Sequence, residues 1–193
     1  DHISLVDAYQ KLSKLLMRLN RLDENVEALK NLVDLDPARQ EAWQLLADVY
    51  QKYGKLQQAI SAIDKALQLN PKNEIHRTTK MNIATKILYQ GDPGKALNLY
   101  EEILRGGPAM LNLHYNMGIA YYKQGDNGKA IRHFRTSIQL FPNEVKSHRS
   151  LGFTYVVTQN VRQAKSSFIR ALQLDPNNTE IQNALAALRK QDN

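Results

Sequence analysis

The 193-residue chain contains no cysteine, which excludes disulfides, thiolate metal ligands and cysteine nucleophiles. It also lacks long hydrophobic runs, and no stretch approaches the ~18 consecutive apolar residues of a membrane-spanning helix. We therefore expect a soluble protein. The absence of cysteine fits a reducing or an oxidising compartment equally well. We favour the cytoplasm, while a periplasmic location or a place in a larger membrane-associated chain stays open. The sequence begins with Asp1 rather than Met, which leaves open a leader or a preceding domain in a longer protein.

Motifs that carry catalysis are missing as well. The segments 91–95 and 125–129 resemble fragments of a phosphate-binding loop, but Ala96 and Ala130 stand where Ser or Thr is required, and no strand precedes either segment. There is no nucleophile elbow and no His-Glu-x-x-His metal motif. We predict that the chain is not an enzyme and that it binds no cofactor or metal.

What the sequence does contain is a repeat marked by proline. Five of the six prolines recur at intervals of 34, 37, 34 and 34 residues: Pro37, Pro71, Pro108, Pro142 and Pro176. A unit of 34 residues with helical patterning is the period of two short antiparallel helices and their turns. The sequence therefore predicts about five helical hairpins in tandem.

Aligning the units on these prolines produces columns with a physical meaning. A small side chain twelve positions before each proline lets two helices approach closely: Asn25, Ala59, Ala96, Ala130 and Ala164. Four positions later, a large apolar column fills the gap between hairpins: Leu29, Ile63, Tyr100, Phe134 and Phe168. The first helix of each repeat carries a second column of small side chains: Ser13, Ala47, Ala84, Gly118 and Gly152. Glycines that can adopt the left-handed conformation end three first helices: Gly54, Gly91 and Gly125.

These columns resemble the tetratricopeptide repeat. The second of the five repeats matches its pattern almost in full, at Trp43, Leu46, Ala47, Tyr50, Gly54, Ala59, Ile63, Ala66 and Pro71. The resemblance covers roughly residues 6–176. It implies an all-α, right-handed superhelical solenoid of antiparallel helix pairs, whose first helices line a concave groove. We predict one domain, 1–193, with repeats at approximately 6–39, 40–73, 74–110, 111–144 and 145–178 and a capping helix at 179–190.

The column of Trp43 differs between the repeats. Lys80 occupies this column in the third repeat, where three extra residues predict a longer first helix. His114 and His148 occupy it in the fourth and fifth repeats. Because this column holds no cysteine and no carboxylate, we predict packing histidines rather than a metal site.

Charge is distributed unevenly along the chain, whose net charge is +7. Residues 1–37 carry −2 and residues 109–193 carry +6. Many cations fall on second helices and should coat the convex face: Lys129, Arg132, Arg135, Lys165 and Arg170. This face is either simply solvated or a surface for an acidic protein, nucleic acid or an anionic membrane. Nucleic-acid binding by the basic C-terminal half is therefore an alternative function, although no regular pair of base-reading side chains is present.

Function is expected in the groove, whose residues follow from helical phase. The inward face is polar in repeats one and two. It is apolar and aromatic in repeats three to five, as expected of a partner site. The predicted partner-binding residues are Met81, Thr85, Leu88, Tyr89, Asn112, Tyr115, Asn116, Ile119, Tyr122, Lys123, Lys146, Arg149, Phe153 and Val156. Burial of Ile119 and Phe153 between first helices stays an alternative. Of the family's five carboxylate-clamp positions only Asn116 and Lys146 match, so chaperone binding is not assigned.

The sequence thus predicts a non-catalytic scaffold or adaptor. It should capture a peptide segment or partner protein with an apolar anchor and some acidic character, mainly on repeats three to five. Self-assembly into a homo-oligomer stays open as a further alternative.

Overall fold

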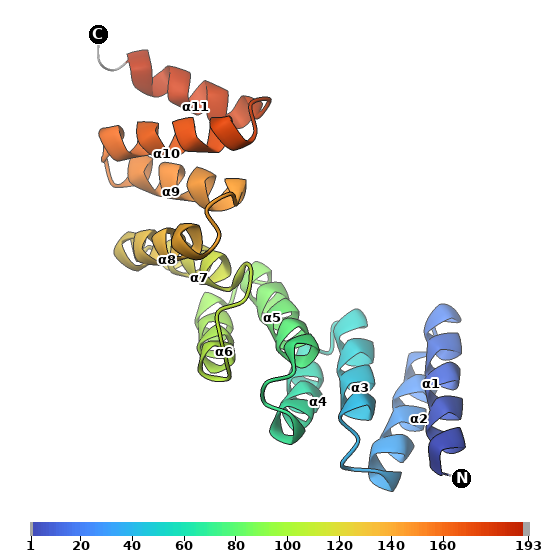
Figure 1. Cartoon of the computed structure of the whole chain (residues 1–193). Helices are drawn as coiled ribbons and strands as arrows, with labels where there is room; N and C mark the ends of the chain where they lie inside the picture. The colour runs from blue at the N-terminus through green and yellow to red at the C-terminus, as the bar shows by residue number, and fades with distance from the viewer. Residues whose placement is uncertain (1, 191–193) are drawn as a thin grey trace. The chain divides into compact units, whose positions relative to one another are not determined.

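The computed structural model describes the backbone of residues 2–190 and the side chains from Asp7 to Lys190, and these residues form eleven α-helices and no strand (Figure 1). Asp1 and residues 191–193, which belong to the predicted domain 1–193, lie outside the described residues. No helix within residues 2–190 is both long and apolar enough to cross a membrane.

The first ten helices come in five pairs along the chain, one pair for each predicted repeat, and a single helix follows. The pairs are α1 (His2–Arg18) and α2 (Leu22–Leu35), α3 (Gln40–Lys52) and α4 (Leu56–Leu69), α5 (Glu74–Tyr89) and α6 (Pro93–Arg105), α7 (Leu113–Lys123) and α8 (Asn127–Leu140), and α9 (Val145–Val157) and α10 (Val161–Leu174). The last helix is α11 (Thr179–Lys190). The all-α helical-repeat fold predicted from the sequence is confirmed.

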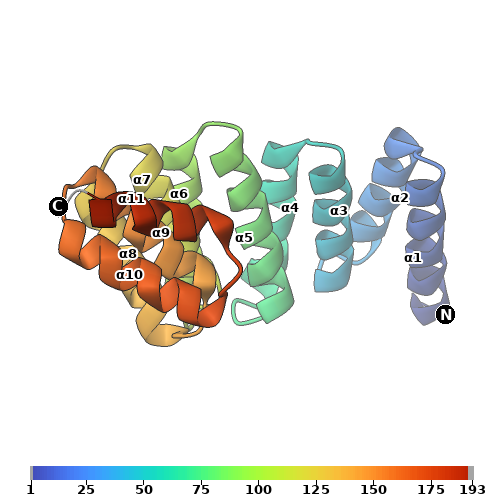
Figure 2. The ribbon, with the colours of Figure 1, turned by 90° about the horizontal axis from the view of Figure 1, so that it is seen from above.

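The chain divides into two compact units, and the division runs through α6. The first unit runs to Gly91 and includes Glu101–Gly107. The second unit contains Asp92–Tyr100 and continues from Pro108. The sequence predicted one domain, because the repeat pattern passes through α6 without interruption. In the first unit, α1 to α4 lie side by side in chain order in both views (Figures 1 and 2).

The predicted columns form the core of the hairpins. All ten side chains of the small and large second-helix columns are fully buried: Asn25, Leu29, Ala59, Ile63, Ala96, Tyr100, Ala130, Phe134, Ala164 and Phe168. In the first unit, the Nδ2 of Asn25 donates a hydrogen bond of 3.1 Å to the backbone oxygen of Ser13. This bond satisfies the Nδ2 of Asn25, whereas its Oδ1 and the hydroxyl of Ser13 are buried without a hydrogen-bond partner among the described residues.

The left-handed residue after each first helix is present in all five repeats. Gly54, Gly91 and Gly125 have φ angles of 74°, 99° and 80°, as predicted. Asn20 and Gln159 take the same conformation in the first and fifth repeats, with φ angles of 57° and 59°. The left-handed conformation is therefore required by the turn that joins the two helices, and glycine only lowers the conformational energy that it costs.

The three extra residues of the third repeat lengthen its first helix, since α5 has 16 residues and α3 has 13. This longer helix carries two buried cations. Arg77 donates to the backbone oxygen of Ile103 at 3.0 Å, and a Cβ at Gly107 would lie 2.8 Å from its Nη1. Lys80 forms ion pairs with Asp64 and Glu102. The unusual repeat is thus held by polar contacts that the sequence pattern does not reveal.

Candidate partner-binding surface

The fourteen predicted groove residues fall on three helices and belong to both units. Met81, Thr85, Leu88 and Tyr89 lie on α5 in the first unit. The other ten lie in the second unit, on α7, on α9 and at the N-cap of α7.

The α5 residues do not form an exposed apolar stripe, and this prediction is wrong for Met81 and Leu88. Their exposed fractions are 7% and 1%. The reason is that α5 packs against both α3 and α4, so more of its circumference is covered than phase alone suggests. Thr85 is half-buried and donates its hydroxyl proton to the backbone oxygen of Met81 at 2.8 Å. Only Tyr89 presents a large apolar surface, with 67% of the residue exposed.

Tyr115 on α7 is also buried, with an exposed fraction of 9%, which corrects the expectation that it stands free in the groove. Its ring packs against Phe134 with ring centroids 5.9 Å apart. The Nζ of Lys146 lies over the same ring, 4.7 Å from its centroid, in cation–π geometry. Tyr115 therefore belongs to the core of the second unit.

Four of the predicted residues do come together, at a pocket of about 240 Å³ that we term the inner pocket. It is lined by Ile119 and Tyr122 from α7, Arg149, Ser150, Phe153 and Thr154 from α9, Phe134 from α8, and Glu180 from α11. Phe153 is half-buried and meets the ring of Phe168 edge-on at 5.0 Å, while Tyr122 remains 39% exposed. The inner pocket thus combines an apolar wall with one cation and one anion.

Glu180 is the residue of this pocket that the sequence reasoning missed. Its Oε2 lies 3.3 Å from the Nη1 of Arg149. Glu180 stands four residues after Pro176, as Lys146 stands four residues after Pro142. The phase rule that selected Lys146 would therefore have selected Glu180, had it been applied to the capping helix as well.

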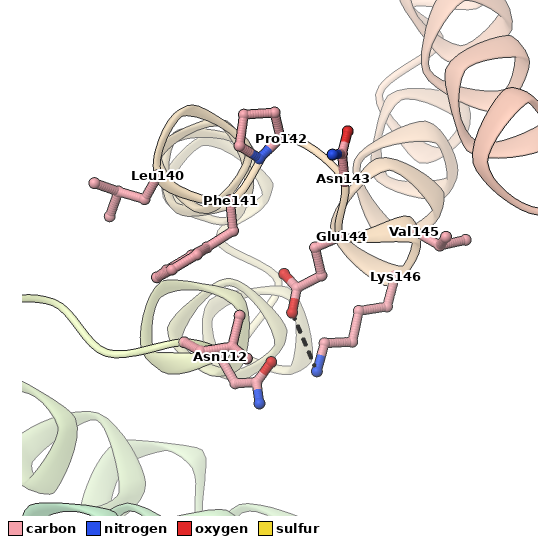
Figure 3. A pocket seen from close by; sticks show the side chains of 9 residues that line it. Asn112, Leu140, Phe141, Pro142, Asn143, Glu144, Val145 and Lys146 are labelled. Carbon is pink, nitrogen blue, oxygen red and sulfur yellow. Dashed lines mark ion pairs between the residues drawn. The ribbon is translucent and has the colours of Figure 1, made fainter. Parts of the chain in front are cut away.

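A second hollow of about 720 Å³, the loop pocket, lies where α8 turns into α9. Its lining residues are Leu111, Asn112, Leu140, Phe141, Pro142, Asn143, Glu144, Val145 and Lys146. Figure 3 shows the Glu144–Lys146 ion pair, in which Nζ and Oε1 are 3.2 Å apart, on one side of the pocket and Leu140 on the other, with the ring of Phe141 between them. The side chain of Glu144 is only 10% exposed and also accepts hydrogen bonds from Ser137 and Ser147.

The loop pocket includes two predicted residues, Asn112 and Lys146. Asn112 has the left-handed φ of 72° at the N-cap of α7, which the sequence reasoning did not foresee. Asn116, Lys123 and Val156 share α7 and α9 but line neither pocket; Asn116 is half-buried and the other two are exposed.

The histidines of the Trp43 column pack into the structure. His148 is buried, and its Nε2 lies 2.9 Å from the backbone oxygen of Pro142. The Nδ1 atoms of His114 and His133 lie 3.1 Å apart. Burial lowers the pKa of His114, and burial followed by the charges of His114 and Arg132 lowers the pKa of His133 to about 4. Across the described residues, no three metal-ligating side chains of His, Cys, Asp or Glu gather at one point.

Comparison with known proteins places this fold in context. The model of the cytochrome c-type biogenesis protein H TPR domain matches residues 26–149, and a tetratricopeptide repeat model matches residues 6–39. Among curated proteins, the chloroplastic tetratricopeptide repeat domain-containing protein PYG7 of Arabidopsis thaliana is 28% identical over 92 residues. That match covers 47% of this chain and 31% of the relative, so the chain spans about a third of that protein.

Solved structures that resemble this chain over most of its length include MamA and YrrB. MamA from Desulfovibrio magneticus RS-1 has a TM-score of 0.69 at 23% identity, covering 91% of this chain and 97% of MamA. YrrB, described as a TPR protein with an unusual peptide-binding site, has a TM-score of 0.69 at 18% identity, covering 91% and 89% of the two chains. At this level of identity the similarity shows a shared fold.

Proposed function

Because the chain belongs to the tetratricopeptide repeat family, we propose that it is a non-catalytic scaffold that captures a segment of another protein on the α7–α9 face of its second unit. The observation that carries this proposal is the inner pocket, which Ile119, Tyr122, Arg149 and Phe153 line together. At about 240 Å³ it is smaller than the roughly 300–1,000 Å³ of small-molecule sites. It therefore suits one apolar side chain of a peptide better than a complete small ligand.

The aromatic and cationic lining of this pocket is of the kind that dominates binding energy at protein interfaces. Tyr and Arg are enriched among the residues whose truncation costs most. Tyr122 belongs to the lining and is 39% exposed, and Arg149 can hold a carboxylate in two-pronged geometry. The captured segment should therefore carry an apolar anchor next to an acidic side chain.

The Arg149–Glu180 ion pair supports an exchange of carboxylates on binding. The two side chains are 37% and 59% exposed, and such pairs contribute only about 0–1 kcal/mol because water screens them. A carboxylate of the partner can replace Glu180 on Arg149 at little cost. Glu180 thus marks the place where the acidic group of the partner is expected.

The test begins with a peptide selected by phage display against the immobilised wild-type chain. Its dissociation constant is then measured by fluorescence anisotropy for Tyr122→Ala and Arg149→Gln, and each variant is expected to bind about 30-fold more weakly, or worse. Arg162→Gln is the matched control, because Arg162 is an exposed cation on α10 that lines neither pocket. Tyr115→Ala is not suitable, since Tyr115 lies in the core.

Two further measurements complete the test. Affinity for the peptide should change little between low and physiological salt, whereas phosphate-driven nucleic-acid binding falls log-linearly with salt. Light scattering shows whether a second copy of the chain occupies the same face. Equal affinity of the wild type and Tyr122→Ala for the selected peptide would overturn the assignment of the inner pocket.

A further inference from the structure

Within each unit, residues at the same three repeat positions come together, two on the second helices of neighbouring repeats and one on the first helix between them, and we call each such place a crevice. The first position is seven residues before the proline of one repeat, and the others are 28 and six residues before the next proline. Between α2 and α4 these are Lys30, Trp43 and Lys65. Between α4 and α6 they are Asp64, Lys80 and Glu102. Between α8 and α10 they are Arg135, His148 and Arg170.

The α4–α6 crevice shows what these positions do when their charges are complementary. Two rim carboxylates, Asp64 and Glu102, hold the Nζ of Lys80 at 2.7 and 2.5 Å. The Lys80 side chain is only 7% exposed, so it fills the crevice from inside the chain. The two carboxylates at the rim are therefore paired with a cation of the chain itself.

The central residue of the crevice makes different hydrogen bonds in different repeats. Trp43 and His148 stand six residues after Pro37 and Pro142, and their ring nitrogens lie 2.9 Å from the backbone oxygens of those prolines. Lys80 stands nine residues after Pro71, and its Nζ donates to Asp64 and Glu102 instead.

The α8–α10 crevice has the opposite rim charge and no internal counterion. A hollow of about 490 Å³ is lined by Arg135, Ile138, Gln139, His148, Leu151, Ser166, Ser167 and Arg170. The guanidinium of Arg170 donates to two neutral oxygens, at 3.3 Å on Asn143 and 3.2 Å on Gln173. Within residues 7–190, whose side chains the structure describes, neither Arg135 nor Arg170 pairs with a carboxylate.

The corresponding crevice of the first unit is filled differently. It also has two cations, Lys30 and Lys65, but Asp34 belongs to its lining and the indole of Trp43 occupies the central position. Among these three crevices, the one between α8 and α10 alone combines a cationic rim with a lining that contains no carboxylate.

We infer that the α8–α10 crevice is a second binding site, which receives a Glu or Asp side chain from an acidic segment of a partner protein between Arg135 and Arg170. The arrangement is that of Lys80 between Asp64 and Glu102 with the signs reversed. The apolar floor of Ile138 and Leu151 strengthens such a pair by excluding water. A nucleic-acid backbone would instead need a track of phosphate contacts, because its affinity grows with the number of neutralised phosphates.

The test uses the full chain and a hexaglutamate peptide, with hexaglutamine as the neutral probe. In an NMR titration, the Nε–Hε resonances of Arg135 and Arg170 are expected to shift with hexaglutamate and not with hexaglutamine. Arg162, an exposed cation on the same helix as Arg170 but outside the crevice, should shift much less. Equal shifts at Arg162 would mean diffuse charge attraction and would overturn the site.

A pair of substitutions at His148 tests the central position directly. His148→Glu places a carboxylate of the chain itself where Lys80 stands in the other crevice, and it is expected to weaken hexaglutamate binding by about tenfold or more. His148→Gln is the control, because Gln182 already makes the equivalent bond to the oxygen of Pro176, at 2.7 Å. Equal affinity of the two variants contradicts the proposal.

Two safeguards keep the outcome clear. If His148→Glu does not fold by circular dichroism, the double variant Arg135→Gln, Arg170→Gln replaces it and should show the same loss of affinity. Oligothymidylate is titrated in parallel, and tighter binding of it at Arg135 and Arg170 would assign the crevice to nucleic acid instead. Tyr122→Ala, at the inner pocket, should bind hexaglutamate like the wild type, which separates this site from the proposed function.

Discussion

Gly118 lies directly beneath the ring of Phe134, so closely that a Cβ on the glycine would stand 2.5 Å from Cε1 and 2.6 Å from Cδ1 of the ring. Gly152 and Phe168 repeat this contact one hairpin later with the same two distances. Real Cβ atoms do not approach an aromatic carbon this closely. The two hairpins of the second unit therefore depend on a missing side chain in the first helix.

Replacing Gly118 with Ala should reduce the free energy of unfolding by about 1–3 kcal/mol, because overpacking a core shifts side chains and backbone. The loss should appear although Ala favours a helix over Gly by about 1 kcal/mol. Gly128→Ala in α8 is the control, since its nearest atom is 3.7 Å away. Urea denaturation measures both variants. Equal stability of the two would mean that Phe134 moves aside freely.

The 34-residue period correctly grouped Gly118 and Gly152 as a small column and Phe134 and Phe168 as a large, buried column. It placed the large column between neighbouring hairpins, however, and did not predict that each phenylalanine packs on the glycine of its own hairpin. Asn20 was missed although asparagine tolerates the left-handed conformation, and Gln159 was missed because glutamine does not favour it. There the turn geometry, common to all five repeats, outweighs the local preference of the residue.

The candidate site was predicted less completely, for two reasons. Helical phase grouped Ile119, Arg149 and Phe153, and the structure has all three in the lining of one pocket. It could not foresee that Met81 and Tyr115 are buried, since burial depends on which neighbouring elements cover each face. Helical phase says which residues share a face of one helix. Whether that face is buried depends on how the neighbouring helices pack against it.

The stability of the second unit should fall as the pH is lowered from about 6.5 to 4, because His133 resists protonation. Its pKa is about 4 in the folded chain, chiefly through burial, against ~6.5 in an unfolded chain. Below pH ~6.5 the unfolded state gains a proton that the folded state does not take up, and the loss levels off below pH 4. The effect should be on the order of 1 kcal/mol, because the ring is partly solvated.

Urea denaturation of the wild type and His133→Gln at several pH values isolates this effect. Carboxylates titrate below pH 5 in both proteins, so their contribution cancels in the difference. We expect the stability difference between the two proteins to change by about 1 kcal/mol between pH 7.5 and 4.5, in favour of His133→Gln at the lower pH. A constant difference would show that His133 is protonated equally easily in both states.

The final prediction concerns α11, which covers the last hairpin. Ile181, Leu185 and Leu188 are buried there and join the cluster that contains Phe168 and Ala171. Truncating a buried leucine to alanine removes apolar contacts and leaves a cavity, at a cost of about 2–5 kcal/mol. Leu185→Ala should therefore destabilise the second unit by this amount. Asn183→Ala, an exposed position on the same helix, should change stability by less than about 0.5 kcal/mol.

Two probes locate the effect of Leu185→Ala along the chain. In a repeat protein, stability is carried mainly by contacts between neighbouring repeats, so damage at the cap should stay near it. Hydrogen exchange should therefore accelerate at amides of α9, α10 and α11 and remain unchanged in α3 and α4. The single tryptophan, Trp43 on α3, provides an independent fluorescence signal from the first unit. A Trp43 transition that shifts with the exchange rates of α11 would show that the chain unfolds as one cooperative block rather than from its C-terminal end.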